Sequence, residues 1–243
     1  MTDPLAELVE LPGVSDAVRA CRAAVDRLLA HRVLRGRSAD VSAESALRGA
    51  WASASLAGAT LSLADVRAGA TDPITQGALR AHGAIGELAD TWTRAPRQAL
   101  ARLHALAAAD LVGDRAALGR PARAMAPRVD ALVDALTTTS APAVVIAAVV
   151  HGELASLNAF PPVSGLVARA AVRLTLVERG LDPKSLAVVE VGHLEARAEH
   201  DAALAGYRAG GPDGVARWLR HCADAVSAGA REALAICEAM QRG

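Results

Sequence analysis

Helical periodicity extends along nearly the whole chain and leaves little sequence from which a β-sheet could form. Alanine, the best helix former, is very abundant, and aromatic residues make up only 2% of the 243 residues. Blocks of alternating Val, Ile, Thr and aromatic residues, which are typical of strands, are missing. Apolar residues instead recur at helical spacing, as in Val18, Cys21, Val25, Leu28 and Leu29. The pattern predicts an all-α protein of about eight or more helices.

Start and stop signals divide the chain into segments, with prolines in the first turn of several of them. We expect long helices over residues 15–35, 42–56, 74–94, 96–111, 127–137, 142–157, 164–179, 193–208 and 213–241. A capping box formed by Ser62 and Asp65 predicts one further short helix. No repeat or low-complexity linker is visible, so we expect one helical domain over residues 41–243 and a helical extension over residues 1–40.

Composition and charge argue against several classes of protein. The net charge is zero and the pI is near 7.1, so there is no basic surplus to attract nucleic acid or an anionic membrane. The longest apolar run, residues 141–150, is well below the roughly 20 residues that a membrane span needs. The N-terminus lacks the apolar segment of a secretory signal, and the three cysteines show no CxxC spacing. We expect a cytoplasmic protein with buried, reduced thiols, and the Arg-rich, Lys-poor composition indicates a GC-rich bacterial source.

A polar, proline-bent loop joins two apolar helical segments at residues 158–169, with the sequence Asn-Ala-Phe-Pro-Pro-Val-Ser-Gly-Leu-Val-Ala-Arg. This loop and the helices on either side resemble the signature loop of the Fic/Doc (Fido) family of nucleotidyl transferases. Two more segments, at residues 44–66 and 197–213, resemble family elements, so four segments including the two flanking helices occur in the family order and the likeness spans about residues 41–225. The resemblance implies a Fic-like helical bundle.

The family motif reads His-x-Phe-x-Asp/Glu-Gly-Asn-Gly-Arg-x-x-Arg, and most of its chemical groups are replaced in this chain. Asn158 occupies the position of the general base, Pro162 that of the magnesium ligand and Leu166 that of the first phosphate-binding Arg. The matching positions that remain are Phe160, Gly165 and Arg169, and His151 precedes the motif at the family spacing. The resemblance therefore implies a degenerate member that has lost AMP transfer.

A second family element supports the same interpretation. Many Fic proteins carry an inhibitory helix with the pattern Ser/Thr-x-x-x-Glu-Gly/Asn, whose Glu pairs with the last Arg of the motif. The matching residues are Ser53, Ala57 and Gly58, so the Glu is replaced by Ala57. We therefore expect Arg169 to lack its internal partner. Under one alternative, Arg169 is free to bind an anion together with Ser164 and the helix N-terminus at Gly165.

The β-hairpin flap that Fic proteins use to hold a target chain is expected to be reduced or absent. The corresponding residues, 113–127, contain no β-branched or aromatic side chain. Four arginines cluster around this segment, and we interpret them as the best candidate contact surface: Arg115, Arg120, Arg123 and Arg128.

Outside the segments that resemble the family, the sequence contains no recognisable metal-binding or catalytic pattern. His151 and Glu153 are two residues apart and point to different helix faces, so we interpret His151 as a structural residue that bonds a backbone carbonyl near the loop. His193, His200 and His221 lie near glutamates without any HExxH pattern, and we place them on solvated faces. No metal site is predicted. The tryptophans are interpreted as core or interface anchors, namely Trp51, Trp92 and Trp218.

Two functional hypotheses follow. The first is a pseudoenzyme, a Fic-like scaffold without a cofactor that acts as an interaction or regulatory module through a protein partner or self-association. The second is a divergent transferase or nucleotide sensor that holds ATP and Mg²⁺ with Arg169, Ser164 and Gly165.

Overall fold

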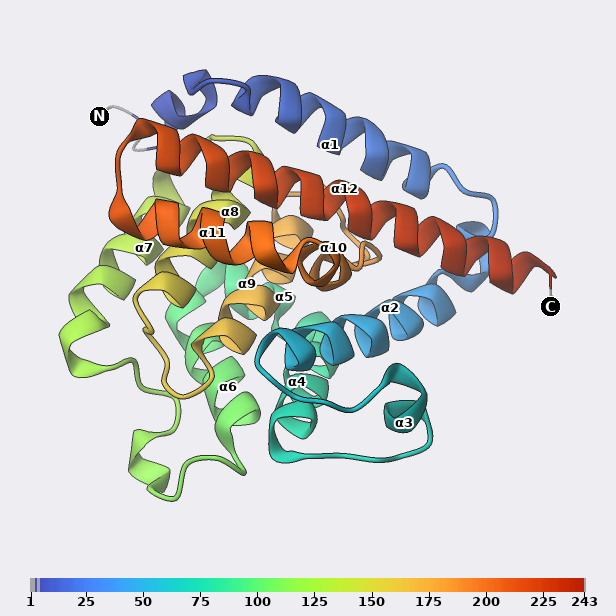
Figure 1. Cartoon of the computed structure of the whole chain (residues 1–243), viewed down its shortest axis with the longest axis horizontal. Coiled ribbons are helices and arrows are strands. Elements are labelled where there is room, and N and C mark those ends of the chain that lie inside the picture. Colours follow the sequence, from blue (N-terminus) through green and yellow to red (C-terminus); the bar gives the residue numbers. More distant parts are fainter. Residues whose placement is uncertain (1–2, 4, 243) are drawn as a thin grey trace.

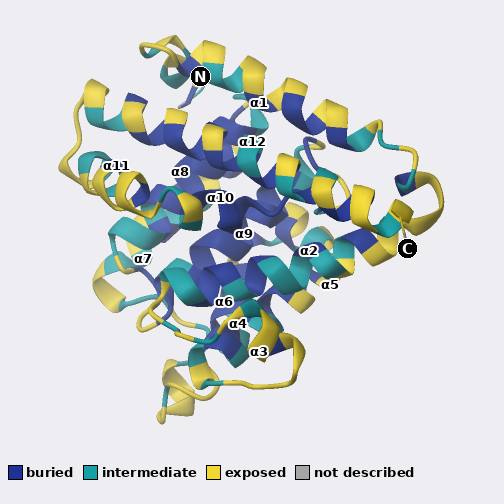
Figure 2. Cartoon of the chain, turned by 45° about the vertical axis from the view of Figure 1, so that its right-hand side comes forward, coloured by how far each residue is buried: buried dark blue, intermediate teal, exposed yellow. Residues whose placement is uncertain are grey.

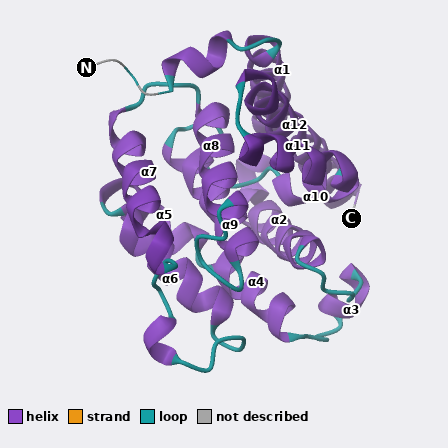
Figure 3. Ribbon diagram, turned by 60° about the vertical axis from the view of Figure 1, so that its left-hand side comes forward, coloured by secondary structure: helices purple, strands orange, loops and turns teal. Residues whose placement is uncertain are grey.

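The computed structural model describes residue 3 and residues 5–242, and within them every regular element is a helix (Figures 1 and 3). The α-helices are α1 (Val14–Leu29), α2 (Leu34–Leu56), α3 (Leu63–Arg67), α4 (Pro73–Gly83), α5 (Ile85–Arg94), α6 (Pro96–Ala108), α7 (Ala126–Thr138), α8 (Ala143–Ser156), α9 (Ser164–Glu178), α10 (Val189–Glu195), α11 (Arg197–Ala209) and α12 (Pro212–Arg242). Short 3-10 helices are η1 (Ala6–Glu10), η2 (Arg115–Ala117) and η3 (Arg123–Met125). The predicted all-α class is confirmed.

Helices α8 and α9 pack against each other at the centre of the molecule, and the loop that resembles the Fic motif connects them. The first two turns of α8 read Ala-Val-Val-Ile-Ala-Ala-Val-Val, which is apolar on every face, and a helix of this kind is stable only when it is surrounded by protein. Figure 2 shows the buried residues concentrated in these two helices, whereas α1 and α12 expose their outer faces. The central hairpin therefore fixes the position of the loop.

Two apolar cores meet at this hairpin, and both contain residues of α8 and α9. The first core includes residues of α4, α5, α6 and α7, and the second includes residues of α1, α2, α10 and α12. Helix α1 runs along α12, so the N-terminal segment shares the second core (Figure 1). Helix α2 crosses the expected boundary at residue 40, with non-helical geometry at Arg37. The division into residues 1–40 and 41–243 stays a prediction.

Several helix boundaries differ from the prediction. The expected helix at residues 15–35 ends at Leu29, and α2 begins at Leu34. The expected helix at residues 74–94 is divided at Ala84, and the one at residues 193–208 belongs to two helices that meet at Ala196. The capping box at Ser62 is present as predicted.

The flap segment contains η2, η3, the loops around them and the first two residues of α7, and no strand occurs among its residues, all of which the structure describes (Figure 3). The prediction of a reduced or absent hairpin is confirmed. Among the described helices, none combines the length and the apolar character that crossing a bilayer requires.

Candidate functional site

The loop between α8 and α9 is held by hydrogen bonds among its own residues. The Ser164 hydroxyl accepts a hydrogen bond from the Phe160 N–H and donates one to Oδ1 of Asn158, both at 2.8 Å. Asn158 is exposed and adopts a positive φ of 48°, a conformation that Asn tolerates better than most residues. Phe160 is buried at the base of the loop, as expected for a core anchor. The polar groups of Asn158 and Ser164 thus bond each other.

His104 on α6 connects this loop to the flap segment, and sequence reasoning did not single it out. Its Nε2 lies 3.1 Å from the Pro161 carbonyl oxygen, and its Nδ1 lies 3.1 Å from the Gly119 amide, which donates to it. This pair of bonds assigns the neutral tautomer with the proton on Nε2. Burial lowers the pKa of His104, so the ring is uncharged at neutral pH. The Ala122 N–H also donates to the Ala159 carbonyl at 2.9 Å, so the flap segment lies against the loop.

Arg169 has an internal partner, contrary to the expectation from Ala57. Its Nε donates to the Ser53 hydroxyl at 2.8 Å, and its Nη2 donates to the Ser53 carbonyl at 2.9 Å. Ser53 lies in the last turn of α2, at the negative end of the helix dipole, and its carbonyl also accepts a hydrogen bond from the Ala57 N–H at 3.2 Å. The end of α2 therefore supplies both acceptors for Arg169, and neither of them is a carboxylate.

The same helix end receives a second arginine. Nη1 of Arg197 donates to the Ser55 carbonyl at 3.1 Å. Ala57 and Gly58 follow at the C-terminus of α2, are exposed, and end the helix with a φ of 97° at Gly58. Of the three residues that match the inhibitory pattern, Ser53 is the one that contacts Arg169.

Arg169 is closed off from solvent. Its side chain is buried, and a Cβ at Gly165 would lie 3.0 Å from Nη1, so glycine leaves room for the guanidinium. Burial lowers the pKa of Arg169 to about 10, which still leaves it charged at neutral pH. The structure brings Ser164, Gly165 and Arg169 together, but Ser164 and Arg169 both bond protein groups rather than facing an open cavity.

One turn further along α9, Arg173 forms a buried ion pair with Glu190 of α10. Nε and Nη2 of Arg173 each donate to a different Glu190 oxygen at 2.8 Å, and Nε2 of His82 lies 3.1 Å from the same carboxylate. Despite burial, Arg173 holds the pKa of Glu190 well below its ordinary value. Ser45 of α2 adds its hydroxyl and carbonyl to the network at 3.3 Å each. These contacts join α2, α4, α9 and α10, and sequence reasoning did not predict them.

The histidines were placed wrongly from the sequence. His193, His200 and His221 are 1%, 5% and 5% exposed, so they do not lie on solvated faces. His151 is fully buried, and neither of its ring nitrogens has the predicted backbone partner. Together they surround Trp218, which is buried as predicted and donates from Nε1 to the Ala148 carbonyl at 2.8 Å. Glu153 turns away from this group and bonds Arg128 and Tyr207.

The larger cavities are not lined by the loop residues 158–169, although the one beside Tyr207 reaches Leu157 next to the loop. One of about 650 Å³ is lined by residues of α2, α4, α5 and the 183–185 turn, one of about 380 Å³ lies beside Tyr207, and one of about 230 Å³ lies beside Trp92. None of these three cavities is lined by Asn158, Ser164 or Arg169.

The structure is an all-helical bundle around a central helix–loop–helix, with Arg169 of α9 bonded to the end of α2, and solved structures identify the fold. A Fic family protein from Desulfovibrio desulfuricans G20 matches with a TM-score of 0.75 and 19% identity, covering 93% of this chain and 75% of that one. A fragment of Fic-1 from C. elegans matches with a TM-score of 0.71 and 17% identity, covering 93% of this chain and 73% of that one.

A single-substitution variant of the same C. elegans fragment matches with a TM-score of 0.71 and 19% identity, covering 96% of this chain and 74% of that one. No family model and no curated relative matches the sequence. The chain therefore has the Fic (Fido) fold, as the resemblance predicted, and at these identities the likeness concerns the fold alone.

Proposed function

We propose that this Fic-fold protein no longer transfers AMP and acts as an interaction or regulatory module. The observation that carries the proposal is the closure of Arg169, which is buried and bonded to Ser53 at the end of α2. A phosphate group could reach the guanidinium only if that helix end moved away. The hydroxyl of Ser164 is also committed, because it bonds Asn158 and Phe160.

The residues of the loop support the same proposal. Asn158 stands where the resemblance places a general base, and its amide cannot take a proton near neutral pH. Pro162 and Leu166 stand where a carboxylate ligand for Mg²⁺ and a phosphate clamp are expected. Each of these groups typically contributes about 10²-fold or more to such a reaction, so their combined loss leaves little catalytic power.

The flap segment is the surface that we propose for a protein partner, which can be another protein or a second copy of this chain. Arg115, Arg120 and Arg123 are exposed there, and none of them forms an ion pair with any residue that the structure describes. Arg128 is instead paired with Glu153. Unpaired arginines on an exposed loop are groups that interfaces commonly use.

Transfer of labelled AMP tests the loss of activity. The full-length protein is incubated with α-labelled ATP, Mg²⁺ and cell lysate, and we expect no labelled protein. Asn158→His combined with Pro162→Asp supplies a base and a carboxylate, and self-labelling by this variant would support a scaffold that lost only its chemistry. Labelling by the unchanged protein that Arg169→Met abolishes would overturn the proposal in favour of a divergent transferase.

The interaction surface is tested separately by reversing its charge. Arg115, Arg120 and Arg123 are changed together to Glu, and the control changes three exposed arginines on α1 to Glu, namely Arg19, Arg22 and Arg27. Sedimentation reports self-association, and quantitative cross-linking in the native host reports other partners. We expect the first variant to lose a contact that the control retains. Equal behaviour of both variants would remove the flap segment from consideration.

A further inference from the structure

Four of the seven histidines of the chain lie in one buried group that joins α8, α10, α11 and α12. The His193 ring centroid is 4.9 Å from that of His151, 5.0 Å from that of His200 and 5.1 Å from that of His221. Burying so many imidazoles together costs free energy unless their nitrogens find partners. The arrangement therefore calls for a compensating interaction.

The nitrogens of this group are only partly satisfied by the protein. Nδ1 of His193 lies 3.0 Å from Nε2 of His221, and Nδ1 of His200 lies 2.9 Å from Oδ1 of Asp201. Both nitrogens of His151 and Nε2 of His200 are buried without a partner among the described residues. These are lone pairs or N–H groups that a bound atom could satisfy.

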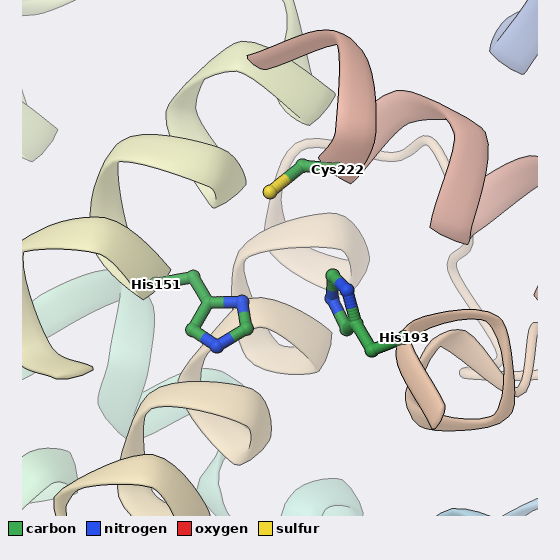
Figure 4. A group of neighbouring side chains, drawn as sticks. All are labelled: His151, His193 and Cys222. Carbon is green, nitrogen blue, oxygen red and sulfur yellow. The ribbon is translucent and has the colours of Figure 1, made fainter. Parts of the chain in front are cut away.

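Cys222 of α12 brings a sulfur to the same place. One candidate ligand atom each from His151, His193 and Cys222 lie within 4.8 Å of one another, and Figure 4 shows the two rings and the sulfur around a shared space. A cavity of about 10 Å³ is lined by these three residues and by apolar side chains, which is roughly the space of one water molecule. Ligand atoms around one metal ion are about 3.5 Å apart, so modest side-chain rotations would close the site.

We propose that His151, His193 and Cys222 bind one thiophilic transition-metal ion, Cu⁺ or Zn²⁺. Two imidazoles and a thiolate suit these ions, whereas Mg²⁺ and Ca²⁺ require oxygen ligands that this group does not offer. The partnerless Nε2 of His200 is the nitrogen available as a fourth ligand for a tetrahedral Zn²⁺.

Charge distinguishes the two ions. With one thiolate and neutral imidazoles, Cu⁺ forms a site of zero net charge, whereas Zn²⁺ leaves one positive charge in the interior. A positive charge is unfavourable there, because all three ligand residues are buried away from water. The charge count favours Cu⁺, and the experiment below includes both ions.

Binding exchanges a proton for the metal without any redox change. Cys222 is a buried free cysteine, so without metal its sulfur is an uncharged S–H group. The S–H bond breaks, the sulfur–metal bond forms and one proton leaves to solvent. Because the site is closed, we expect the ion to enter during folding rather than through the folded surface.

Refolding with defined metals tests the proposal. The full-length chain, prepared without a histidine tag, is unfolded with a chelator and refolded with Zn²⁺, with Cu⁺ under anaerobic reducing conditions, with Co²⁺, or without metal. We expect about one Cu⁺ or Zn²⁺ per chain by elemental analysis. Co²⁺ should produce a sulfur-to-cobalt charge-transfer band in the near ultraviolet.

Cysteine variants make the test specific. Cys222→Ser should hold at least about tenfold less metal, and Cys237→Ser, which changes another buried cysteine of α12, should hold as much as the unchanged chain. The charge-transfer band of the unchanged protein decides the question if Cys222→Ser does not fold. A polar core filled by water would give no band and no stoichiometric metal, and either that result or equal metal in both variants would overturn the proposal.

Discussion

Arg169 is a buried cation with neutral acceptors: the hydroxyl and the carbonyl of Ser53 at the end of α2. A charged group that is removed from water must recover most of its hydrogen bonds. The negative end of the α2 dipole also attracts the charge of Arg169. Arg197 lies at the same helix end and donates to the Ser55 carbonyl. Arg169 therefore stabilises the contact between α2 and α9 without an acidic partner.

Removal of one acceptor should measure this contact. We predict that Ser53→Ala lowers the free energy of unfolding by about 1.5–3 kcal/mol, because a hydrogen bond to a buried charged group is lost. Ser55→Ala is the matched control, since its hydroxyl bonds only the Trp51 carbonyl within α2, and it should cost about 0.5 kcal/mol or less. Chemical denaturation of both variants checks the difference. Equal losses would mean that the Ser53 hydroxyl contributes nothing to holding Arg169.

His104 gives the loop a dependence on pH. Its pKa is lowered in the folded protein, so its contribution to stability is present above the unfolded pKa near 6.5 and is lost as the pH falls. We predict that the stability advantage of the unchanged chain over His104→Gln shrinks by up to about 1.4 kcal/mol between pH 7.5 and pH 5.5. Urea denaturation at both pH values measures it. A constant difference would show that His104 titrates normally in the folded protein.

The burial of large apolar side chains was predicted from the sequence more successfully than the hydrogen-bond partners of polar side chains. Phe160 and Trp218 were expected to be buried, and they are, because large apolar rings have few alternatives. The partner of Arg169 was missed because a serine hydroxyl and a backbone carbonyl carry no pattern in the sequence. His104 was missed for the same reason, since both of its partners are backbone groups.

Helix α10 lies unusually close to α12, and glycines make the approach possible. A Cβ at Gly192 of α10 would overlap the Ala225 backbone, and a Cβ at Gly229 of α12 would overlap the Val188 backbone. The Val188 N–H donates to the Gly229 carbonyl at 3.0 Å, so the approach also allows a hydrogen bond. This packing holds His193 of α10 beside His221 and Cys222 of α12.

A pair of glycine substitutions tests the packing. We predict that Gly192→Ala lowers the free energy of unfolding by about 1–3 kcal/mol, because the backbone of α12 must move away. Gly86→Ala is the control in α5, where a Cβ meets no atom within 4 Å, and it should raise stability by about 0.5–1 kcal/mol. Thermal or chemical denaturation gives both values. A neutral Gly192→Ala would mean that the two helices are further apart than described.

Helix type was predictable, whereas some helix ends were not. Alanine-rich sequence favours helix on both sides of Ala84 and Ala196, so propensity contains no signal for the divisions there. The helix starts at Ser62, Pro96 and Pro212 carry local signals and lie where the sequence places them or within one residue. Helix boundaries that depend on tertiary packing therefore could not be predicted from the sequence.

The assembled molecule contains sites that no single segment encodes. The order of four family-like segments was enough to predict the Fic fold, which solved structures confirm at TM-scores of 0.71–0.75. The histidine and cysteine group is formed from four helices, with residues as far apart as His151 and Cys222, and none of its spacings matches a metal motif. Such a group becomes visible only when the helices are packed.

Arg169 is bonded to Ser53 of the protein itself, and we propose that it therefore holds no nucleotide. Calorimetric titration of Mg²⁺ and ATP into the full-length protein tests this proposal, with Arg169→Met as the matched variant. We expect no heat of binding for either protein up to millimolar ATP. Saturable binding of ATP by the unchanged protein that Arg169→Met abolishes would contradict it.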